Sequence, residues 1–183
     1  NLDSYMNQKY RPLEEIRREH PKIEAEHLAG RFSEGIVDNL RYVLEQFGSD
    51  PIIVRSSSLL EDNFGFSFAG KYSSYFCPNQ GTPKENLRDL LDAIRRVYAS
   101  TINPDAILYR KHHGLIDYDE RMAVLLQRVR GKRYGRYFMP SIAGVGFSRN
   151  PFRWHPKIRR EDGFLRIVWG VGTRAVDRVD NDY

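Results

Sequence analysis

The stretch Pro51-Ile-Ile-Val-Arg-Ser-Ser-Ser-Leu-Leu-Glu-Asp62 decides how this chain is organised. It begins with Ile52-Ile-Val54, a short apolar and β-branched run that follows turn-forming residues at 48–51. Such a run is typical of a central strand covered on both faces. The sequence therefore predicts a buried strand, with Arg55 at its end.

The residues after this predicted strand carry groups that bind phosphate. Ser56, Ser57 and Ser58 supply hydroxyls, and the small residues Ala69-Gly70 allow backbone N–H groups to approach a ligand. A guanidinium fork beside hydroxyls and backbone N–H groups is what polyphosphate recognition requires. The alternative, a solvated junction between a strand and a loop, is the commoner outcome for this composition.

Size and composition limit the class of protein. The chain has 183 residues, of which 40% are hydrophobic and 29% charged, so we expect a globular protein of one domain or two closely packed lobes. It contains neither an apolar run near the ~20 residues of a membrane span nor a basic-then-apolar leader. Cys77 is the only cysteine, which excludes an intrachain disulfide and favours a cytoplasmic location and a packing role for the thiol.

The charge balance predicts an anionic partner. Lys and Arg number 29 against 24 Asp and Glu, giving a formal net charge of +5 and a pI near 9.3. Nucleotide phosphates and nucleic acid both satisfy that requirement. The sequence begins at Asn1 rather than Met, so we expect a piece of a longer polypeptide.

Hydrophobic spacing predicts helices and strands in irregular alternation. The polar segment 2–20 is expected to be peripheral, with a short helix at 13–18. The other expected elements are a helix from the Ser33 cap to Gly48, a strand at 71–77 antiparallel to the first, a helix beginning at Pro83, a shorter one at 106–110 closed by Gly114, and a buried strand at 122–129 containing the polar Gln127.

Val-Arg-Ser-Ser-x-x-x-Glu-Asp at 54–62, followed by Ser67-Phe-Ala-Gly70, resembles a known family. The pattern is similar to the N-terminal ATP-binding domain of phosphoenolpyruvate synthase and pyruvate phosphate dikinase, a branch of the ATP-grasp enzymes. Ala93–Ser100 and Ala106–Arg110 continue the resemblance in order and spacing, and Pro140–Pro151 is similar to the family's Ser-Gly-Val-x-Phe-Thr-x-Asn-Pro segment.

The resemblance implies an α+β fold of the ATP-grasp type, in which two lobes clamp ATP. Residues 1–48 would form an N-terminal helical segment, 49–118 the first lobe with its flanking helices, and 119–183 the second lobe. Mostly antiparallel sheets flanked by helices are expected in both lobes.

The resemblance also assigns roles to individual residues. Arg55 is the expected catalytic residue, holding phosphate charge during transfer, while Ser56, Ser57 and the backbone at 69–71 orient the phosphates. Gln127 is expected on the adenine side or in a structural hydrogen bond. The complete set of expected nucleotide-binding residues is Ser56, Ser57, Ala69, Gly70, Lys71, Gln127 and Thr173.

The predicted metal site lies near the C-terminal end. Gly170-Val-Gly-Thr173 resembles the family's Gly-Leu-Gly-Glu stretch, with Thr173 where the family has a Glu that serves the nucleotide or its metal. Threonine cannot offer an anionic oxygen to Mg²⁺. We therefore expect Asp177 or Asp180 to take that role, with Asp177 as the chosen ligand. His112 and His113 are assigned a structural role, because no cysteine or carboxylate stands at ligand spacing.

By resemblance, the function is transfer of phosphate from ATP to a histidine on another domain and then to pyruvate. The expected cofactors are ATP and Mg²⁺, and the expected partners are the phosphohistidine and pyruvate-binding domains of a parent chain. This chain alone is expected to bind nucleotide weakly and to catalyse no turnover.

Two other functions stay open at this point. Thr173 in the acidic position suggests a non-catalytic, regulatory ATP-grasp-like module. Arg128–Tyr137 is a basic, tyrosine-containing hairpin that would suit nucleic acid. A solvated β-turn is favoured for it, so nucleic acid is not the expected partner.

Overall fold

The computed structural model describes residues 8–61, 70–118, 121–150 and 155–170. The chain divides into two compact units, residues 1–128 and 129–183. Both contain antiparallel strands, and the first adds helices, so this is a mixed α+β protein as predicted.

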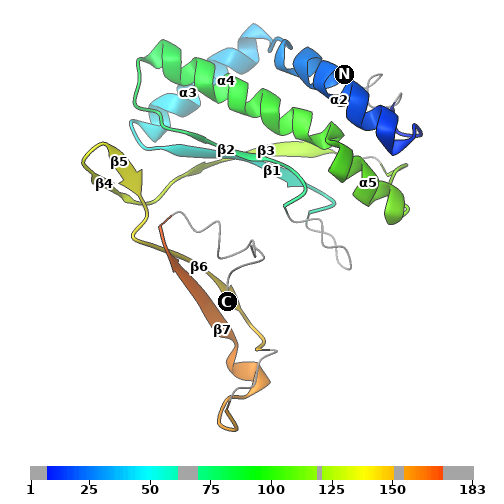
Figure 1. Ribbon diagram of the computed structural model, residues 1–183. Coiled ribbons are helices and arrows are strands. Elements are labelled where there is room, and N and C mark those ends of the chain that lie inside the picture. Colours follow the sequence, from blue (N-terminus) through cyan, green and yellow to red (C-terminus); the bar gives the residue numbers. More distant parts are fainter. Residues whose placement is uncertain (1–7, 62–69, 119–120, 151–154, 171–183) are drawn as a thin grey trace. The chain divides into compact units, whose positions relative to one another are not determined.

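The first unit is built on a three-stranded antiparallel sheet with β1 (Ile52–Ser58) in the middle. β2 (Ser74–Cys77) lies on one side of β1, and β3 (Met122–Arg128) lies on the other. The helices α3 (Glu34–Phe47) and α4 (Pro83–Ala99) cover one face of this sheet (Figure 1). The predicted antiparallel pairing of the first two strands is confirmed.

The core of this unit lies between the sheet and the helices. Ile52 and Val54 of β1 are completely buried, and α4 packs on both β1 and β2. The buried members of this core are Leu44, Ile52, Val54, Cys77, Leu90, Ala93, Ile94 and Val97. Because successive strand side chains point to opposite faces, the helices cover only alternate residues of β1.

The expectation that the strand at 52–54 is covered on both faces is wrong for the described residues, and the strand at 122–129 is less buried than expected. Ile53 is partly buried and Arg55 is exposed, and β3 alternates between partly buried and exposed side chains. Among the described residues of this unit, helices cover one face of the three strands, and the other face carries exposed side chains such as Arg55 (Figure 1). A short apolar run cannot distinguish these two cases by itself.

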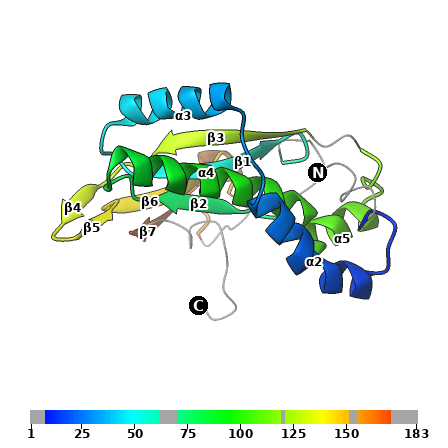
Figure 2. The ribbon, with the colours of Figure 1, turned by 90° about the horizontal axis from the view of Figure 1, so that it is seen from above.

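The N-terminal segment is also more integrated than its polar sequence predicts. α2 (Leu13–Leu28) is a 16-residue helix that continues through Pro21, and it packs against α4 and α5 (Pro104–His112) (Figure 2). A proline inside a helix removes one backbone hydrogen bond and crowds the preceding turn. Ile16 and Ile23, buried on either side of Pro21, offset that cost by packing.

Side chains before α2 fasten it further to the region after α5. Lys9 forms an ion pair with Asp117, and the Tyr10 hydroxyl donates a hydrogen bond to the Asp117 Oδ1 atom over 2.5 Å. Lys111 of α5 donates to the Arg11 carbonyl. The segment is therefore not peripheral.

Local sequence chemistry sets the helix ends as expected. Thr82 caps α4 in a reciprocal capping box, with its N–H donating to the Glu85 carboxylate over 2.8 Å. These hydrogen bonds hold the pKa of Glu85 below its usual value. Ser33 stands at the N-cap position of α3, but the capping hydrogen bond predicted for its side chain does not form. Gly48 ends α3 with a φ of 62°, a conformation that glycine adopts without strain.

The second unit contains two antiparallel strand pairs in its described part. β4 (Lys132–Tyr134) pairs with β5 (Tyr137–Met139), and β6 (Ile142–Phe147) pairs with β7 (Phe164–Trp169). The predicted close backbone approach in β6 is confirmed at Gly144, where an added Cβ would lie 2.4 Å from the Arg166 carbonyl oxygen.

The first compact unit extends beyond the predicted lobe boundary at 118/119. β3 pairs along its whole length with β1, from Ile52 opposite Arg128 to Ser58 opposite Met122. The division into lobes at that boundary stays a prediction. No helix in the parts of the chain that the structure describes is long and apolar enough to cross a membrane.

Asn79 joins the two loops at one end of this sheet. It has a φ of 55° and is 5% exposed, and its Nδ2 atom donates to the carbonyls of Gly48 (2.9 Å) and Asp50 (3.0 Å). Asparagine tolerates this left-handed conformation better than most residues. Asn79 thus links the end of α3 to the start of α4.

We expect Asn79→Ala to lower the free energy of unfolding by about 2–4 kcal/mol, because it leaves two carbonyls unpaired and places alanine at a positive φ. Asn79→Gly relieves the backbone strain but not the lost hydrogen bonds, so it should cost less. Urea unfolding followed by circular dichroism measures both. Lys84→Ala, on the exposed surface of α4, is the control. Equal stability of Asn79→Ala and the wild type would contradict this role.

Candidate functional site

The open face of the three-stranded sheet presents Arg55 to solvent. On β1 the side chains of Ile53, Arg55 and Ser57 alternate with the buried Ile52 and Val54. Arg55 lies opposite Ser74 of β2 on one side and Leu125 of β3 on the other. The predicted catalytic arginine therefore stands near the middle of an exposed face.

Arg55 contacts a second predicted site residue. Its Nη1 atom donates a long hydrogen bond of 3.4 Å to the Oε1 atom of Gln127, which is 72 residues away in the sequence. Gln127 is exposed on β3, directly opposite Ile53 and diagonal to Arg55. One long bond leaves most of the five guanidinium N–H groups available for other acceptors.

Ser56 and Ser57 do not share a face. Ser56 is two residues after the buried Val54, so its side chain points to the same face of the sheet. Its Oγ atom donates a hydrogen bond to the Glu61 Oε1 atom over 2.9 Å. The same carboxylate accepts a hydrogen bond from the Ser58 backbone N–H at 3.2 Å. Glu61 therefore caps the turn that follows β1, and only Ser57 joins Arg55 on the open face.

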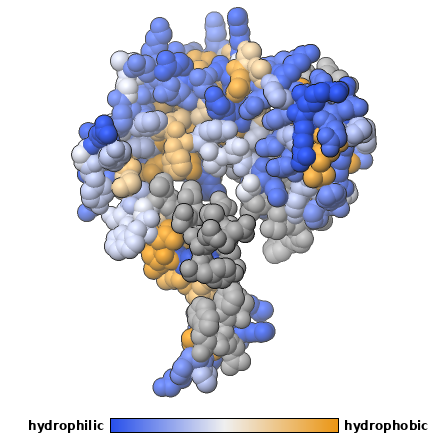
Figure 3. Space-filling model, viewed as in Figure 1, coloured by the Kyte–Doolittle hydropathy of each residue, from blue (hydrophilic) through white to orange (hydrophobic). Residues whose placement is uncertain are grey.

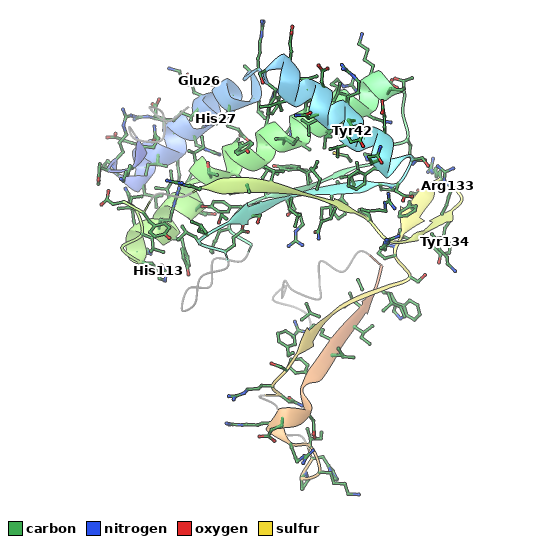
Figure 4. The ribbon with its side chains drawn as sticks, turned by 180° about the vertical axis from the view of Figure 1, so that it is seen from behind. Glu26, His27, Tyr42, His113, Arg133 and Tyr134 are labelled. Atoms are coloured by element: carbon green, nitrogen blue, oxygen red, sulfur yellow. The ribbon has the colours of Figure 1, made fainter. Side chains whose placement is uncertain are left out.

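Lys71 is held at the side of α5. Its Nζ atom lies 5.4 Å from the centre of the Tyr109 ring, and that ring stacks on His113 with 4.0 Å between centroids. His113 lies at the C-terminal end of α5 (Figure 4), and its Nδ1 atom is 2.9 Å from the Tyr109 carbonyl oxygen. Gly70, next to Lys71, is exposed with a φ of 77°.

Several predicted site residues lie outside the described part of the chain. They are Ala69, Thr173 and Asp177, together with Asp180, the alternative metal ligand. Among the residues that the structure describes, no three His, Cys, Asp or Glu side chains gather as a metal site would require.

The open face has an apolar component that sequence reasoning missed. Phe76 is 50% exposed and Leu125 is 42% exposed, and both flank the β1 residues of this face. Figure 3 shows hydrophobic surface over the sheet, whereas the outer surface of the helices is mostly hydrophilic. The alternation of Ser74, Phe76, Leu125 and Gln127 along the edge strands is the signal that could have revealed it.

Comparison with known proteins supplies the context for this face. A family model described as "Pyruvate phosphate dikinase, AMP/ATP-binding domain" matches residues 1–183. The chain belongs to this family. The predicted family is thus confirmed, and with it the prediction of an ATP-binding domain.

Curated relatives of this AMP/ATP-binding domain carry two different names. A phosphoenolpyruvate synthase of Deinococcus radiodurans is 28% identical over 152 residues, covering 82% of this chain and 17% of the relative. The phosphoenolpyruvate synthase of Escherichia coli is 33% identical over 133 residues, covering 70% and 14%. A rifampicin phosphotransferase of Bacillus cereus is 27% identical over 142 residues, covering 77% and 14%. The chain thus spans less than a fifth of the length of these relatives.

We expect alanine substitutions of Ser56 and Ser57 to affect different properties of the protein, stability and MgATP affinity respectively. Ser57→Ala, on the face of Arg55, is expected to weaken MgATP binding about 5- to 10-fold through loss of one hydroxyl, with little effect on stability. Ser56→Ala should lower the free energy of unfolding by about 1 kcal/mol, because Glu61 loses a donor, and should change MgATP affinity less than twofold. Calorimetric titration and urea unfolding of both variants measure this. The reverse pattern would show that Ser56 faces the nucleotide.

Cys77 is a packing residue without thiolate character. It is 4% exposed, and burial, aided by the negative charge of Asp89, raises the pKa of its thiol to about 11. We therefore expect no reaction with Ellman's reagent at pH 8 in the folded protein and one reactive thiol per chain after unfolding in denaturant. Rapid labelling of the folded protein would contradict this assignment.

Proposed function

We propose that the open sheet face around Arg55 is the phosphate side of the ATP site in this AMP/ATP-binding domain. The observation that carries the proposal is the position of Arg55, exposed in the middle of this face, where its hydrogen bond to Gln127 is a long one. A guanidinium presents a planar set of donors that matches phosphate oxygens, and it keeps its charge at any physiological pH.

The surroundings of Arg55 supply complementary groups. Ser57 adds a hydroxyl on the same face, and Gln127 restrains the guanidinium through its amide oxygen. Phe76 and Leu125 provide apolar surface on either side of the β1 residues. We propose Gln127 as a residue that orients Arg55, with adenine contact as its alternative role.

The remaining assignments of the site belong to this same proposal. The backbone at Ala69 and Gly70 and the ammonium group of Lys71 would contact phosphates. Thr173 would contact the nucleotide, and Asp177 would hold Mg²⁺. The overall architecture is proposed to be an ATP-grasp fold, with residues 1–48 as a helical segment, 49–118 in the first lobe and 119–183 in the second.

For the parent protein we propose transfer of phosphate from ATP to a histidine on another domain. The names of the relatives support a phosphotransfer role, since they include phosphoenolpyruvate synthases and rifampicin phosphotransferases. Two names with different phosphate acceptors imply that the acceptor is chosen outside the segment they share with this chain. Pyruvate is the proposed acceptor, and a pyruvate-binding domain the proposed partner, in a cytoplasmic protein.

Isothermal titration of MgATP into the 183-residue chain tests the site. We expect saturable binding by the wild type and at least 10-fold weaker binding by Arg55→Ala, because a hydrogen bond to a charged group contributes about 1.5–3 kcal/mol. Arg55→Lys should lie between them, since a lysine keeps the charge but loses the planar fork.

Arg41→Ala is the matched control, because Arg41 is an exposed arginine on α3 that pairs only locally with Asp38. Circular dichroism confirms that every variant is folded. Equal affinity of Arg55→Ala and the wild type for MgATP would place the phosphate site elsewhere.

A further inference from the structure

One short segment of the second unit and its approach is strongly basic. Residues 128–137 contain five Lys or Arg and no Asp or Glu, and the net charge of the whole chain is +5. The remaining sequence therefore has 24 basic and 24 acidic residues. A second run, residues 149–160, also contains five Lys or Arg and no Asp or Glu, so residues 128–137 are one of two basic runs that can attract an anionic partner.

Arg128, the first of these five cations, is already paired. Its Nε atom lies 3.0 Å from the Asp50 carboxylate, and its guanidinium lies 5.6 Å from the centre of the Phe47 ring. Arg128 ends β3 and belongs to the first compact unit. The other four cations, Arg130, Lys132, Arg133 and Arg136, are exposed residues on or beside the β4–β5 hairpin.

The hairpin places two tyrosines side by side on one face. Gly135 and Arg136 form a two-residue turn, with Gly135 at a φ of 61°, and Tyr134 is paired directly with Tyr137. Directly opposed residues of an antiparallel pair project from the same face. Tyr134 is 50% exposed and Tyr137 is 58% exposed. Lys132 lies on the same face, because it precedes Tyr134 by two residues in β4.

Polar contacts hold these rings in position without burying them. The Tyr134 hydroxyl lies 3.1 Å from the Ser141 Oγ atom. The Arg136 guanidinium lies 5.3 Å from the centre of the Tyr137 ring, and its Nη2 atom donates to the Tyr137 hydroxyl over 3.2 Å. Figure 4 shows Arg133 and Tyr134 on β4 of this hairpin. The hairpin thus combines an ordered aromatic pair with positive charge.

We propose that the β4–β5 hairpin binds single-stranded nucleic acid, with bases stacked on Tyr134 and Tyr137 and phosphates paired with the surrounding cations. Exposed rings beside Lys and Arg provide the stacking and the phosphate contacts that sequence-tolerant binding of single strands requires. Tyrosine and arginine also occur at protein interfaces, and the close alternation of rings and cations along one short hairpin favours a strand of stacked bases and phosphates. The proposal uses neither Arg55 nor the open sheet face, so it is independent of the ATP site.

The test measures fluorescence anisotropy of a labelled oligouridylate of roughly ten nucleotides, a length within the site sizes of single-strand binders, titrated with the 183-residue chain. A salt series gives the number of phosphate contacts, because each contributes about −0.7 to the slope of log K against log salt for single strands. Arg133 alternates to the face opposite the rings, so Arg130, Lys132 and Arg136 are the cations counted, and three phosphate contacts predict a slope of about −2.1.

Two double variants distinguish binding by the hairpin cations from attraction by the overall net charge. Lys132→Gln with Arg136→Gln should weaken binding at least 10-fold and reduce the magnitude of the slope by about 1.4. Arg17→Gln with Lys22→Gln removes the same charge from exposed positions on α2 and should change affinity less than twofold. Equal losses in the two doubles would overturn the proposal in favour of unspecific attraction.

A second pair of variants tests the rings at constant charge. Tyr134→Leu with Tyr137→Leu should weaken binding at least 10-fold at an unchanged salt slope, because stacking contributes about 1–3 kcal/mol per base. Tyr134→Phe with Tyr137→Phe should retain most of the affinity. Unchanged binding by the leucine double would refute base stacking. Competition by inorganic polyphosphate as strong as that by unlabelled oligouridylate at equal phosphate concentration would also refute it.

Discussion

The burial of Ile52 and Val54 under the helices is the constraint on which the first unit depends. Each contributes about 1.5–3 kcal/mol by leaving water, and both belong to a strand that is paired on its two edges. Because strand side chains alternate, fixing these two residues inward fixes Arg55 outward. A slip of one residue would drive the guanidinium into the core and bring the apolar side chains out. The same packing that stabilises the sheet therefore orients the candidate phosphate-binding group.

The helix boundaries in this chain depend on residues within one turn of each helix end, so they can be predicted from the sequence. Thr82 and Glu85 form their capping box within one turn, and Gly48 ends α3 through its own backbone freedom. Pro21 shows the limit of this reasoning. Local chemistry predicts a break there, but packing on Ile16 and Ile23 sustains the helix, and that packing depends on α4 and α5.

The candidate site was predictable in part for the same reason. The phosphate-binding chemistry of Arg55 and the hydroxyls after it is evident from the sequence. The strand does not end at Arg55 as predicted, because β1 continues to Ser58, and this continuation places Ser56 and Ser57 on opposite faces. The contact between Arg55 and Gln127 was not predictable, because it requires the register of β1 against β3 across 72 residues. Whether the strand has one open face also depends on which elements cover it. The apolar run 52–54 does not contain that information.

The distribution of charge separates two kinds of anion recognition in this molecule. Residues 1–128 contain 17 Lys or Arg and 19 Asp or Glu, so the first unit carries no net positive charge to attract a nucleotide. At physiological salt, charges more than about 8 Å apart in solvent are largely screened, so recognition of ATP has to come from groups in direct contact with it. The alternating β1 strand provides such a group by placing Arg55 on an open face. The excess of basic residues lies instead in residues 129–183, with 12 Lys or Arg against 5 Asp or Glu, and there the β4–β5 hairpin combines positive charge with paired tyrosines.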